Sequence, residues 1–356
     1  MRVEISDRVQ AFCEAEGLRV PILMAPMAGA SPVALSAAVA RAGGMGACGA
    51  LLMGPEAISD WASEMRSAAN GAFQMNLWIP DPDPVRDAGH ESAVRGFLGQ
   101  WGPEVAAEDG DAPLQDFEAQ CDALLRAGPA VVSSIMGIYP AEFVAELKAR
   151  GIRWYATVTT VAEALEAEAA GADVIVAQGM EAGGHRGAFE AERAAQQLVG
   201  LFSLLPAVVD AVKVPIVATG GIADARGIAA ALILGASAVQ IGTGLLRAPE
   251  AGIATPWADA MEGARPEGTT ATRAFSGRLG RSITTEYTKA AAEGPEPAPY
   301  PIQRNLTAKM RAEAGKAGDL SRMQAWAGQS AGLAVAEPAE ALVTRLWEEA
   351  QGMLAG

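Results

Sequence analysis

Cysteine and histidine are scarce in this chain, and their scarcity excludes several kinds of site. Its 356 residues include two histidines and three widely spaced cysteines (Cys13, Cys48, Cys121), with no C-x-x-C pair. Neither a zinc site nor a disulfide framework is supported, and a reducing cytoplasm is the expected compartment. The sequence also has no H-x-x-x-H or H-E-x-x-H pattern, and no G-x-S-x-G elbow between an expected strand and helix. We therefore expect neither a metal ion nor a Ser-His-Asp triad.

Positive charge is also in short supply, with 27 basic against 42 acidic residues and a net charge of −15. This balance argues against nucleic acid and anionic membranes as partners. The first 17 residues have no apolar core, so we do not expect a signal peptide. Residues 227–246 carry no charge, but Gly235, Gly242 and Gly244 divide them into a helix, a turn and a strand rather than a membrane span. Small molecules are the expected partners.

Short apolar runs alternate with helical patterns along most of the sequence, which predicts a closed (β/α)8 TIM barrel. No G-x-G-x-x-G follows the first apolar run, and its absence weighs against a Rossmann domain. The expected strands are 21–25, 45–49, 73–77, 130–133, 153–158, 174–178, 215–219 and 238–241. The expected helices between and after them are 32–42, 55–68, 114–127, 140–150, 161–170, 201–212 and 227–234.

Three regions are expected along the chain. Residues 1–249 form the barrel core, with residues 79–113, rich in Pro, Asp and Gly, as a loop insertion. Residues 250–330 lack the alternating pattern and are expected to form a smaller, mainly helical lid domain. Residues 331–356 contain an amphipathic pattern over 339–351 and are expected to form a closing helix that packs back on the barrel.

The residues with chemical potential follow the expected strands, where the active sites of such barrels lie. Asn76 ends the third strand, and Gln178 ends the sixth and precedes Gly183, Gly184 and His185. A histidine on a helix face is usually structural, but one that follows two glycines at a strand end is exposed to the pocket. We therefore expect His185 to act in catalysis or substrate binding. His90 is expected to be a solvent-facing loop residue. Glu181 could be a general base, but we expect it to be a loop carboxylate that faces solvent.

Glycine pairs follow the two last strands, at Gly220-Gly221 and Gly242-Thr243-Gly244. They could be ordinary turns, but in this fold these two loops frequently hold a phosphate through backbone N–H groups and a helix N-terminus. Thr243 would add a hydroxyl donor. The side-chain amides of Asn76 and Gln178 could meet a flat heterocycle. A cofactor with a phosphate tail and a hydrogen-bonding ring is expected, and FMN fits best.

Four segments, Pro21–Gly29, Gln178–Gly187, Gly220–Ile222 and Ala236–Thr243, resemble the nitronate monooxygenases, formerly called 2-nitropropane dioxygenases. The resemblance runs from about residue 18 to 345. The Gly-Gly-His segment is shared with flavin-dependent enoyl-ACP reductases and marks the superfamily. Two late motifs, one at Tyr300–Gln303 with Asn305–Thr307 and the other at Trp326–Gln329, are more specific to the monooxygenases.

The resemblance implies an FMN-binding barrel whose flavin is covered by a helical domain. It implies that His185 is the active-site histidine and that Tyr300 and Lys309 lie on the substrate side. The implied cofactor-binding residues are Ala25, Pro26, Met27, Asn76, Gln178, Gly183, Gly184, Gly220, Gly221, Gln240, Gly242, Thr243 and Gln329.

The leading hypothesis is therefore the FMN-dependent oxidation of alkyl nitronates, such as propionate 3-nitronate, by O₂ to carbonyl compounds and nitrite. His185 would orient the anionic nitro group or take the α-proton of a neutral nitroalkane. The alternative is an NAD(P)H-dependent flavin reductase that acts on quinones or enoyl thioesters. A third possibility is a flavin-binding module whose output is a partner contact. The chain is expected to be a monomer or a homodimer.

Overall fold

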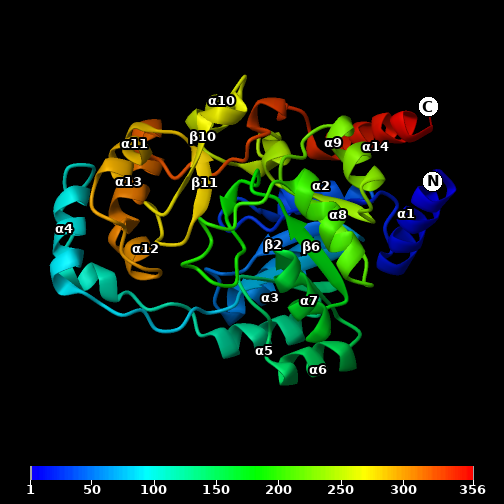
Figure 1. Ribbon diagram of the computed structural model, residues 1–356, viewed down its shortest axis with the longest axis horizontal. Helices are drawn as coiled ribbons and strands as arrows, with labels where there is room; N and C mark the ends of the chain where they lie inside the picture. The colour runs from blue at the N-terminus through cyan, green and yellow to red at the C-terminus, as the bar shows by residue number, and fades with distance from the viewer. Residues whose placement is uncertain (1, 356) are drawn as a thin grey trace.

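Eight parallel strands form a barrel at the centre of the molecule (Figure 1). The computed structural model describes residues 2–355. The strand order is β1-β9-β8-β6-β5-β4-β3-β2, and a bridge between Leu23 and Met45 joins the two end strands. The predicted (β/α)8 barrel is confirmed. Its strands are β1 (Ile22–Met24), β2 (Gly46–Gly49), β3 (Phe73–Trp78), β4 (Val131–Ile135), β5 (Arg153–Val158), β6 (Val174–Gln178), β8 (Ile216–Thr219) and β9 (Ala238–Ile241).

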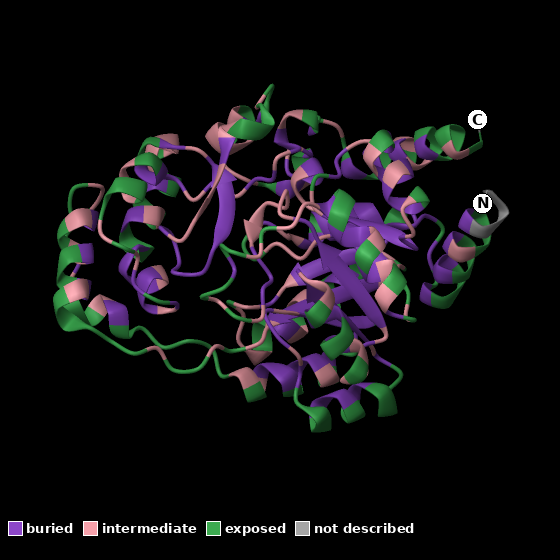
Figure 2. Ribbon diagram, viewed as in Figure 1, coloured by how far each residue is buried: buried purple, intermediate pink, exposed green. Residues whose placement is uncertain are grey.

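The strands are short and apolar because both of their faces are covered (Figure 2). All five residues of β6 are buried, for example. The surrounding helices are α2 (Val33–Arg41), α3 (Pro55–Ala68), α5 (Phe117–Ala127), α6 (Ala141–Ala149), α7 (Val161–Ala169), α8 (Leu201–Ala211) and α9 (Ala225–Ile233). Local sequence sets where these helices begin: at α7 the Thr160 hydroxyl accepts the Glu163 N–H, and the Glu163 carboxylate accepts the Thr160 N–H.

Two terminal helices complete the barrel region. Helix α14 (Ala339–Ala355) packs against α2 and α9, and α1 (Arg2–Glu16) also contacts α9. The two termini lie near each other at one end of the molecule (Figure 1). Helix α1 was not predicted, although Ile5, Val9, Phe12 and Cys13 follow a helical spacing and are buried along one face. No helix within residues 2–355 is long and apolar enough to cross a membrane.

The second region of the molecule is built from two separate segments of the chain. Its C-terminal segment holds α10 (Thr255–Met261), α11 (Glu286–Glu293), α12 (Ile302–Leu306), α13 (Ala308–Ala317) and two strands, β10 (Thr269–Thr272) and β11 (Gly280–Ile283). The other segment lies within residues 79–113, which were expected to be a loop. It contains α4 (Ala88–Leu98) and the short 3-10 helix η1 (Ala107–Asp111). Val94 and Leu98 of α4 share an apolar cluster with Phe275, Ile302 and Leu306.

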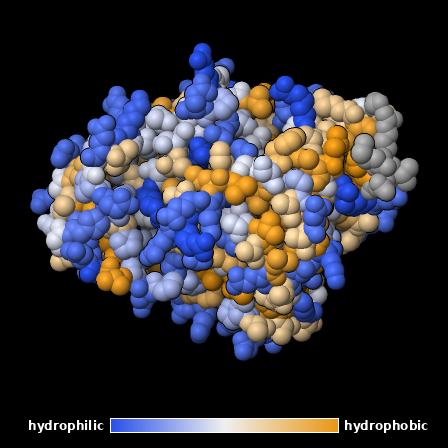
Figure 3. Space-filling model, viewed as in Figure 1, coloured by the Kyte–Doolittle hydropathy of each residue, from blue (hydrophilic) through white to orange (hydrophobic). Residues whose placement is uncertain are grey.

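We refer to residues 79–113 and 250–330 together as the lid. Hydrophilic residues cover most of the lid in the view of Figure 3, whereas hydrophobic residues gather over the barrel helices nearer the termini. Phe202 of α8 and Ile233 of α9 are among the exposed apolar side chains.

A small antiparallel sheet connects the lid to the barrel. Strand β7 (Gly184–His185) pairs with β11, which in turn pairs with β10, and Gly280 lies opposite His185. The lid strands were not predicted from the sequence. Their pairing means that the backbone position of His185 is set by the barrel loop and by the lid together.

Candidate functional site

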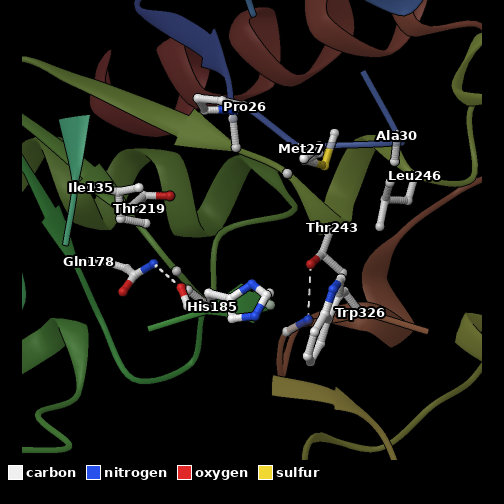
Figure 4. A pocket seen from close by; sticks show the side chains of 18 of the residues that line it. Pro26, Met27, Ala30, Ile135, Gln178, His185, Thr219, Thr243, Leu246 and Trp326 are labelled. Carbon is white, nitrogen blue, oxygen red and sulfur yellow. Dashed lines mark hydrogen bonds between the residues drawn. The ribbon is translucent and has the colours of Figure 1, made fainter. Parts of the chain in front are cut away.

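A cavity lies at the carboxyl ends of the barrel strands, between the barrel and the lid (Figure 4). The lid contributes Ser276, Arg304, Arg311, Gln324 and Trp326 to its lining. Most of the residues predicted for the cofactor also line it, and so does His185. These cofactor residues are Ala25, Pro26, Met27, Asn76, Gln178, Gly183, Gly184, Gly220, Gly221, Gln240, Gly242 and Thr243.

The side-chain amide of Gln178 holds the loop that carries His185. Its Nε2 donates to the His185 carbonyl at 3.0 Å, and its Oε1 accepts the Gly187 N–H at 2.8 Å. Figure 4 shows the first of these bonds. The buried Arg186 side chain adds a bond to the Gln178 carbonyl at 2.6 Å. A strand-end glutamine thus fixes the shape of the loop as well as lining the cavity.

The side-chain amides of Gln240 and Asn76 each keep one hydrogen-bonding group free for a ligand. Gln74 Nε2 donates to the Met24 carbonyl and to Gln240 Oε1, each at 3.0 Å. Because the Met24 carbonyl can only accept, this pattern assigns the orientation of both glutamine amides and leaves Gln240 Nε2 as a free donor. Asn76 Nδ2 donates to Ser133 Oγ at 3.1 Å, so its Oδ1 is a free acceptor. A donor and an acceptor from different strands thus suit the edge of a planar ring.

The turns after β8 and β9 supply backbone donors. Gly220 and Gly221 have φ of +105° and +72°, a left-handed conformation that favours glycine. Within the described residues, the N–H groups of Gly221 and Thr243 have no acceptor. The Asp224 side chain already caps the first turn of α9. An anion would therefore be held by the two turns rather than by the α9 N-terminus.

The lid contacts these turns directly. The Thr243 hydroxyl accepts the Gly328 N–H at 2.9 Å (Figure 4), and its own proton stays available for an anion. A Cβ on Gly183 would lie 2.4 Å from the Gly328 nitrogen, whereas one on Gly184 would meet nothing within 4 Å. Gly183 is thus required for the approach of the lid backbone. Gly184 provides the turn, with φ of +73°.

The ring of His185 is surrounded by two tryptophan side chains and a serine hydroxyl. Its ring lies edge-on to Trp78 at 4.6 Å and to Trp326 at 4.8 Å between ring centroids. Its Nε2 is 2.7 Å from Ser276 Oγ, and Ser276 Oγ donates to the Arg278 carbonyl at 3.2 Å. Since a serine has one proton, this network assigns the hydrogen of His185 to Nε2 and leaves Nδ1 as an acceptor.

The electrostatic environment keeps His185 neutral. Burial, followed by the positive charges of Arg278, Arg311 and Arg304, lowers its pKa from 6.5 to about 3. At neutral pH the ring therefore carries no charge. It can donate or accept hydrogen bonds but cannot neutralise an anion.

Three of the predicted residues do not line the cavity. Gln329 donates its backbone N–H to the Glu181 carbonyl at 2.9 Å, so its motif braces the loop before His185. Lys309 is half-exposed and forms an ion pair with Asp109 at 2.7 Å. Tyr300 lies behind Trp78, with ring centroids 5.4 Å apart, and is only 8% exposed.

The buried Tyr300 hydroxyl has no hydrogen-bond partner within the described residues. Burial raises the pKa of Tyr300, so the hydroxyl keeps its proton and stays a donor. Leaving such a group unpaired costs about 1–3 kcal/mol. Because Trp78 lines the cavity and Tyr300 does not, this hydroxyl is not exposed to a ligand there.

Glu181 and His90 serve other purposes. The Glu181 carboxylate accepts the Leu201 N–H at 2.9 and 3.0 Å and so caps α8, rather than facing solvent as a free base. His90 lies in α4 and is partly buried, and its Nε2 is 2.7 Å from the Glu296 carbonyl. No group of three or more His, Cys, Asp or Glu side chains within residues 2–355 is arranged to hold a metal ion.

Sequence reasoning missed Ser276, Arg304 and Arg311. The two arginines are seven residues apart, which places them on one face of the α12–α13 segment, whereas the family resemblance implied Lys309, which lies between them. Ser276 lies in a loop without any motif, and only the fold brings it to His185.

The barrel, the lid and a cavity lined by two backbone turns and a neutral histidine are those of an α/β-barrel enzyme with its site at the strand ends. Comparison with known families identifies the family to which this enzyme belongs. The model of the family described as nitronate monooxygenase matches residues 12–349, and the chain belongs to this family.

Relatives and solved structures agree with this assignment. A nitronate monooxygenase of Paraburkholderia phytofirmans is 39% identical over 342 residues, which cover 94% of this chain and 93% of that protein. A probable nitronate monooxygenase of Staphylococcus aureus is 32% identical over 333 residues, which cover 92% and 94%. Nitroalkane oxidase from Streptomyces ansochromogenes superposes with a TM-score of 0.87 and 34% identity, with 96% of this chain and 99% of that chain covered. FabK from Thermotoga maritima has a TM-score of 0.75 and 27% identity, with 96% of each chain covered.

Proposed function

We propose that this protein is an FMN-dependent nitronate monooxygenase that oxidises alkyl nitronates with O₂ to carbonyl compounds and nitrite. The observation that carries the proposal is one shared cavity. The two glycine turns, the amides of Asn76 and Gln240, and neutral His185 all line it, and no Asp or Glu side chain within residues 2–355 does. A cavity without carboxylates suits an anionic substrate.

The residues present fit FMN. The free N–H groups of Gly221 and Thr243 and the Thr243 hydroxyl would hold its phosphate, and Gln240 Nε2 and Asn76 Oδ1 would meet polar atoms of its ring. When bound, the flavin supplies the one-electron and O₂ chemistry that amino-acid side chains lack.

His185 acts as a neutral ring that orients the nitronate. Its Nε2 proton goes to Ser276 in the described network. The Ser276 hydroxyl can instead donate to Nε2, and Nδ1–H then becomes the donor toward a nitronate oxygen. A ring with a pKa of about 3 is a poor base for a neutral nitroalkane, whereas a nitronate has already lost its α-proton. This favours orientation over proton abstraction as the role of His185.

The test of the function is product analysis. The purified protein should release FMN on denaturation, and aerobic incubation with propionate 3-nitronate should yield nitrite and the carbonyl compound. A protein that purifies with another flavin, or one that makes no nitrite, would contradict the proposal.

Thr243→Val is expected to weaken FMN binding about tenfold, because it removes one hydroxyl donor from the phosphate site and the acceptor of the Gly328 N–H. Quenching of flavin fluorescence on titration of the apoprotein measures the dissociation constant. Thr344→Val, on exposed α14, is the matched control and should leave it unchanged. Equal dissociation constants for FMN in the two variants would show that Thr243 does not contribute to FMN binding.

The pH dependence of turnover distinguishes a neutral ring from a titrating base. The folded pKa of His185 lies below the ordinary value of 6.5, so its neutral form persists at every pH above about 5. We expect kcat/KM for ethyl nitronate to show no inflection near pH 6.5. An acidic limb with a midpoint near 6.5 that disappears in His185→Gln would show that the ring titrates normally.

A further inference from the structure

Two lid arginines face the cavity without an acidic partner. Arg304 of α12 and Arg311 of α13 are both half-buried and line the cavity. Arg304 contacts Asn305 Oδ1 at 3.3 Å. Arg311 donates to Thr307 Oγ1 at 3.0 Å, to Gln324 Oε1 at 3.0 Å and to the Arg304 carbonyl at 2.8 Å. Among residues 2–355, no Asp or Glu forms an ion pair with either arginine.

This arrangement is unfavourable unless a ligand completes it. A buried arginine is usually paired with a carboxylate, and the neighbouring Arg278 is an example, since its Nε donates to Asp81 Oδ2 at 2.8 Å. For Arg311, burial and then the charge of Arg304 lower the pKa to about 10, so the two cations disfavour each other. The chain has 42 acidic against 27 basic residues, so a shortage of carboxylates does not explain why the two arginines lack an acidic partner. Partly buried charges without partners are costly, and a bound anion removes that cost.

We propose that Arg304 and Arg311 form a subsite for a planar two-oxygen anion of the substrate, which is either the nitronate group itself or a carboxylate on the same molecule. The inference rests on the proposed function, and it assigns to Arg304 and Arg311 the selection of anionic over neutral substrates. A guanidinium group presents paired N–H donors that match two coplanar oxygens, as in a nitronate or a carboxylate.

The subsite is separate from the phosphate turns. Gly221 and Thr243 lie at the ends of β8 and β9 in the barrel, whereas both arginines belong to the lid. Arg311 donates to the Thr307 hydroxyl, which donates to the carbonyl of Phe275, next to Ser276. Because Ser276 contacts His185, this places the anion on the histidine side of the cavity. His185 is neutral and cannot supply the positive charge that the substrate needs.

The subsite also replaces Lys309 as the cation of the substrate side. Lys309 was expected there, but its ammonium group pairs with Asp109 outside the cavity lining. Arg304 and Arg311 flank it in sequence and point the other way. The consequence is selection for charge, because an anionic nitronate gains these contacts and a neutral nitroalkane does not.

Arg304→Gln is the sharpest variant, because Arg304 makes few contacts of its own whereas Arg311 ties α12, α13 and Gln324 together. Steady-state kinetics with ethyl nitronate and with propionate 3-nitronate are expected to show KM raised about tenfold to a hundredfold. Arg304→Lys should recover part of the loss, because it keeps the charge without the fork. Lys316→Gln removes one positive charge from the exposed face of α13 and should leave both KM values unchanged.

The two substrates identify the anion. A rise in KM for both means that the arginines hold the nitronate group, and a rise for propionate 3-nitronate alone means that they hold its carboxylate. If Arg304→Gln binds a full complement of FMN and matches Lys316→Gln with both substrates, the subsite does not exist.

A binding measurement separates this inference from the proposed function. Nitrite and acetate, two planar two-oxygen anions, are titrated into the FMN-loaded protein while the flavin absorbance is followed. Saturable binding by wild type that weakens at least tenfold in Arg304→Gln supports the subsite, even if no nitronate is oxidised. Equal binding by both proteins would overturn it.

Discussion

His185→Ala is expected to lower kcat/KM for propionate 3-nitronate by about 10²–10³-fold, the usual cost of losing one group that positions or polarises the reacting centre. The FMN content should stay at the wild-type level, because His185 contacts Ser276, Trp78 and Trp326 and the cofactor donors lie elsewhere. Rates of nitrite formation and the flavin spectrum together measure both quantities.

The matched comparison is His185→Gln, which keeps a neutral hydrogen-bonding side chain at this position. It should lose less activity than His185→Ala if the ring acts by orientation. Wild-type rates in His185→Ala with FMN bound would instead favour a flavin-binding module whose output is a partner contact.

Gly183→Ala is expected to separate the lid from the barrel loop, with a loss of stability of about 1–3 kcal/mol and weaker retention of FMN. The new methyl group would lie 2.4 Å from the Gly328 nitrogen, 2.6 Å from the Ala327 carbonyl carbon and 2.8 Å from Thr243 Oγ1. Two of these atoms are backbone and cannot move unless the lid segment shifts. Thermal unfolding with and without added FMN measures the effect.

Gly315→Ala is the control for this substitution. Gly315 lies within α13, and a Cβ there would meet nothing within 4 Å. It should be neutral or stabilise the protein slightly, because alanine favours a helix. Equal melting temperatures for the two variants would show that the lid does not depend on the close approach at Gly183.

Much of the barrel could be predicted because its signals are local. Runs such as Val174–Ala177 are apolar on both faces, and a parallel sheet covered by helices requires that composition. Gln178, Gly221 and Thr243 were then placed at one end by the rule that parallel strands share a direction. The sequence could therefore bring together residues far apart in the chain.

The lid could not be predicted in the same way, because its structure depends on distant contacts. Val94 and Leu98 are ordinary helix residues until α12 and the loop at Phe275 cover them. The two-residue strand β7 exists only because Gly280 and Arg281 pair with it. A short strand has no period of its own to detect.

The substrate side shows the limit most clearly. Family resemblance placed Lys309 there, but side-chain direction on a helix depends on which face the neighbours cover. Asp109, from the other lid segment, holds Lys309 outside the cavity lining, and Arg304 and Arg311 line the cavity. The NAD(P)H-dependent reductase stays an alternative prediction, since the fold is shared by both activities.

Oxygen uptake by the FMN-loaded protein tests the central claim most directly. Propionate 3-nitronate is added in the absence of any pyridine nucleotide, and NADH or NADPH with a quinone is added in a parallel reaction. We predict rapid oxygen uptake with nitrite release in the first reaction and little consumption of NADH or NADPH in the second. Absence of uptake with the nitronate, together with rapid oxidation of NADH or NADPH, would contradict the account and identify a reductase.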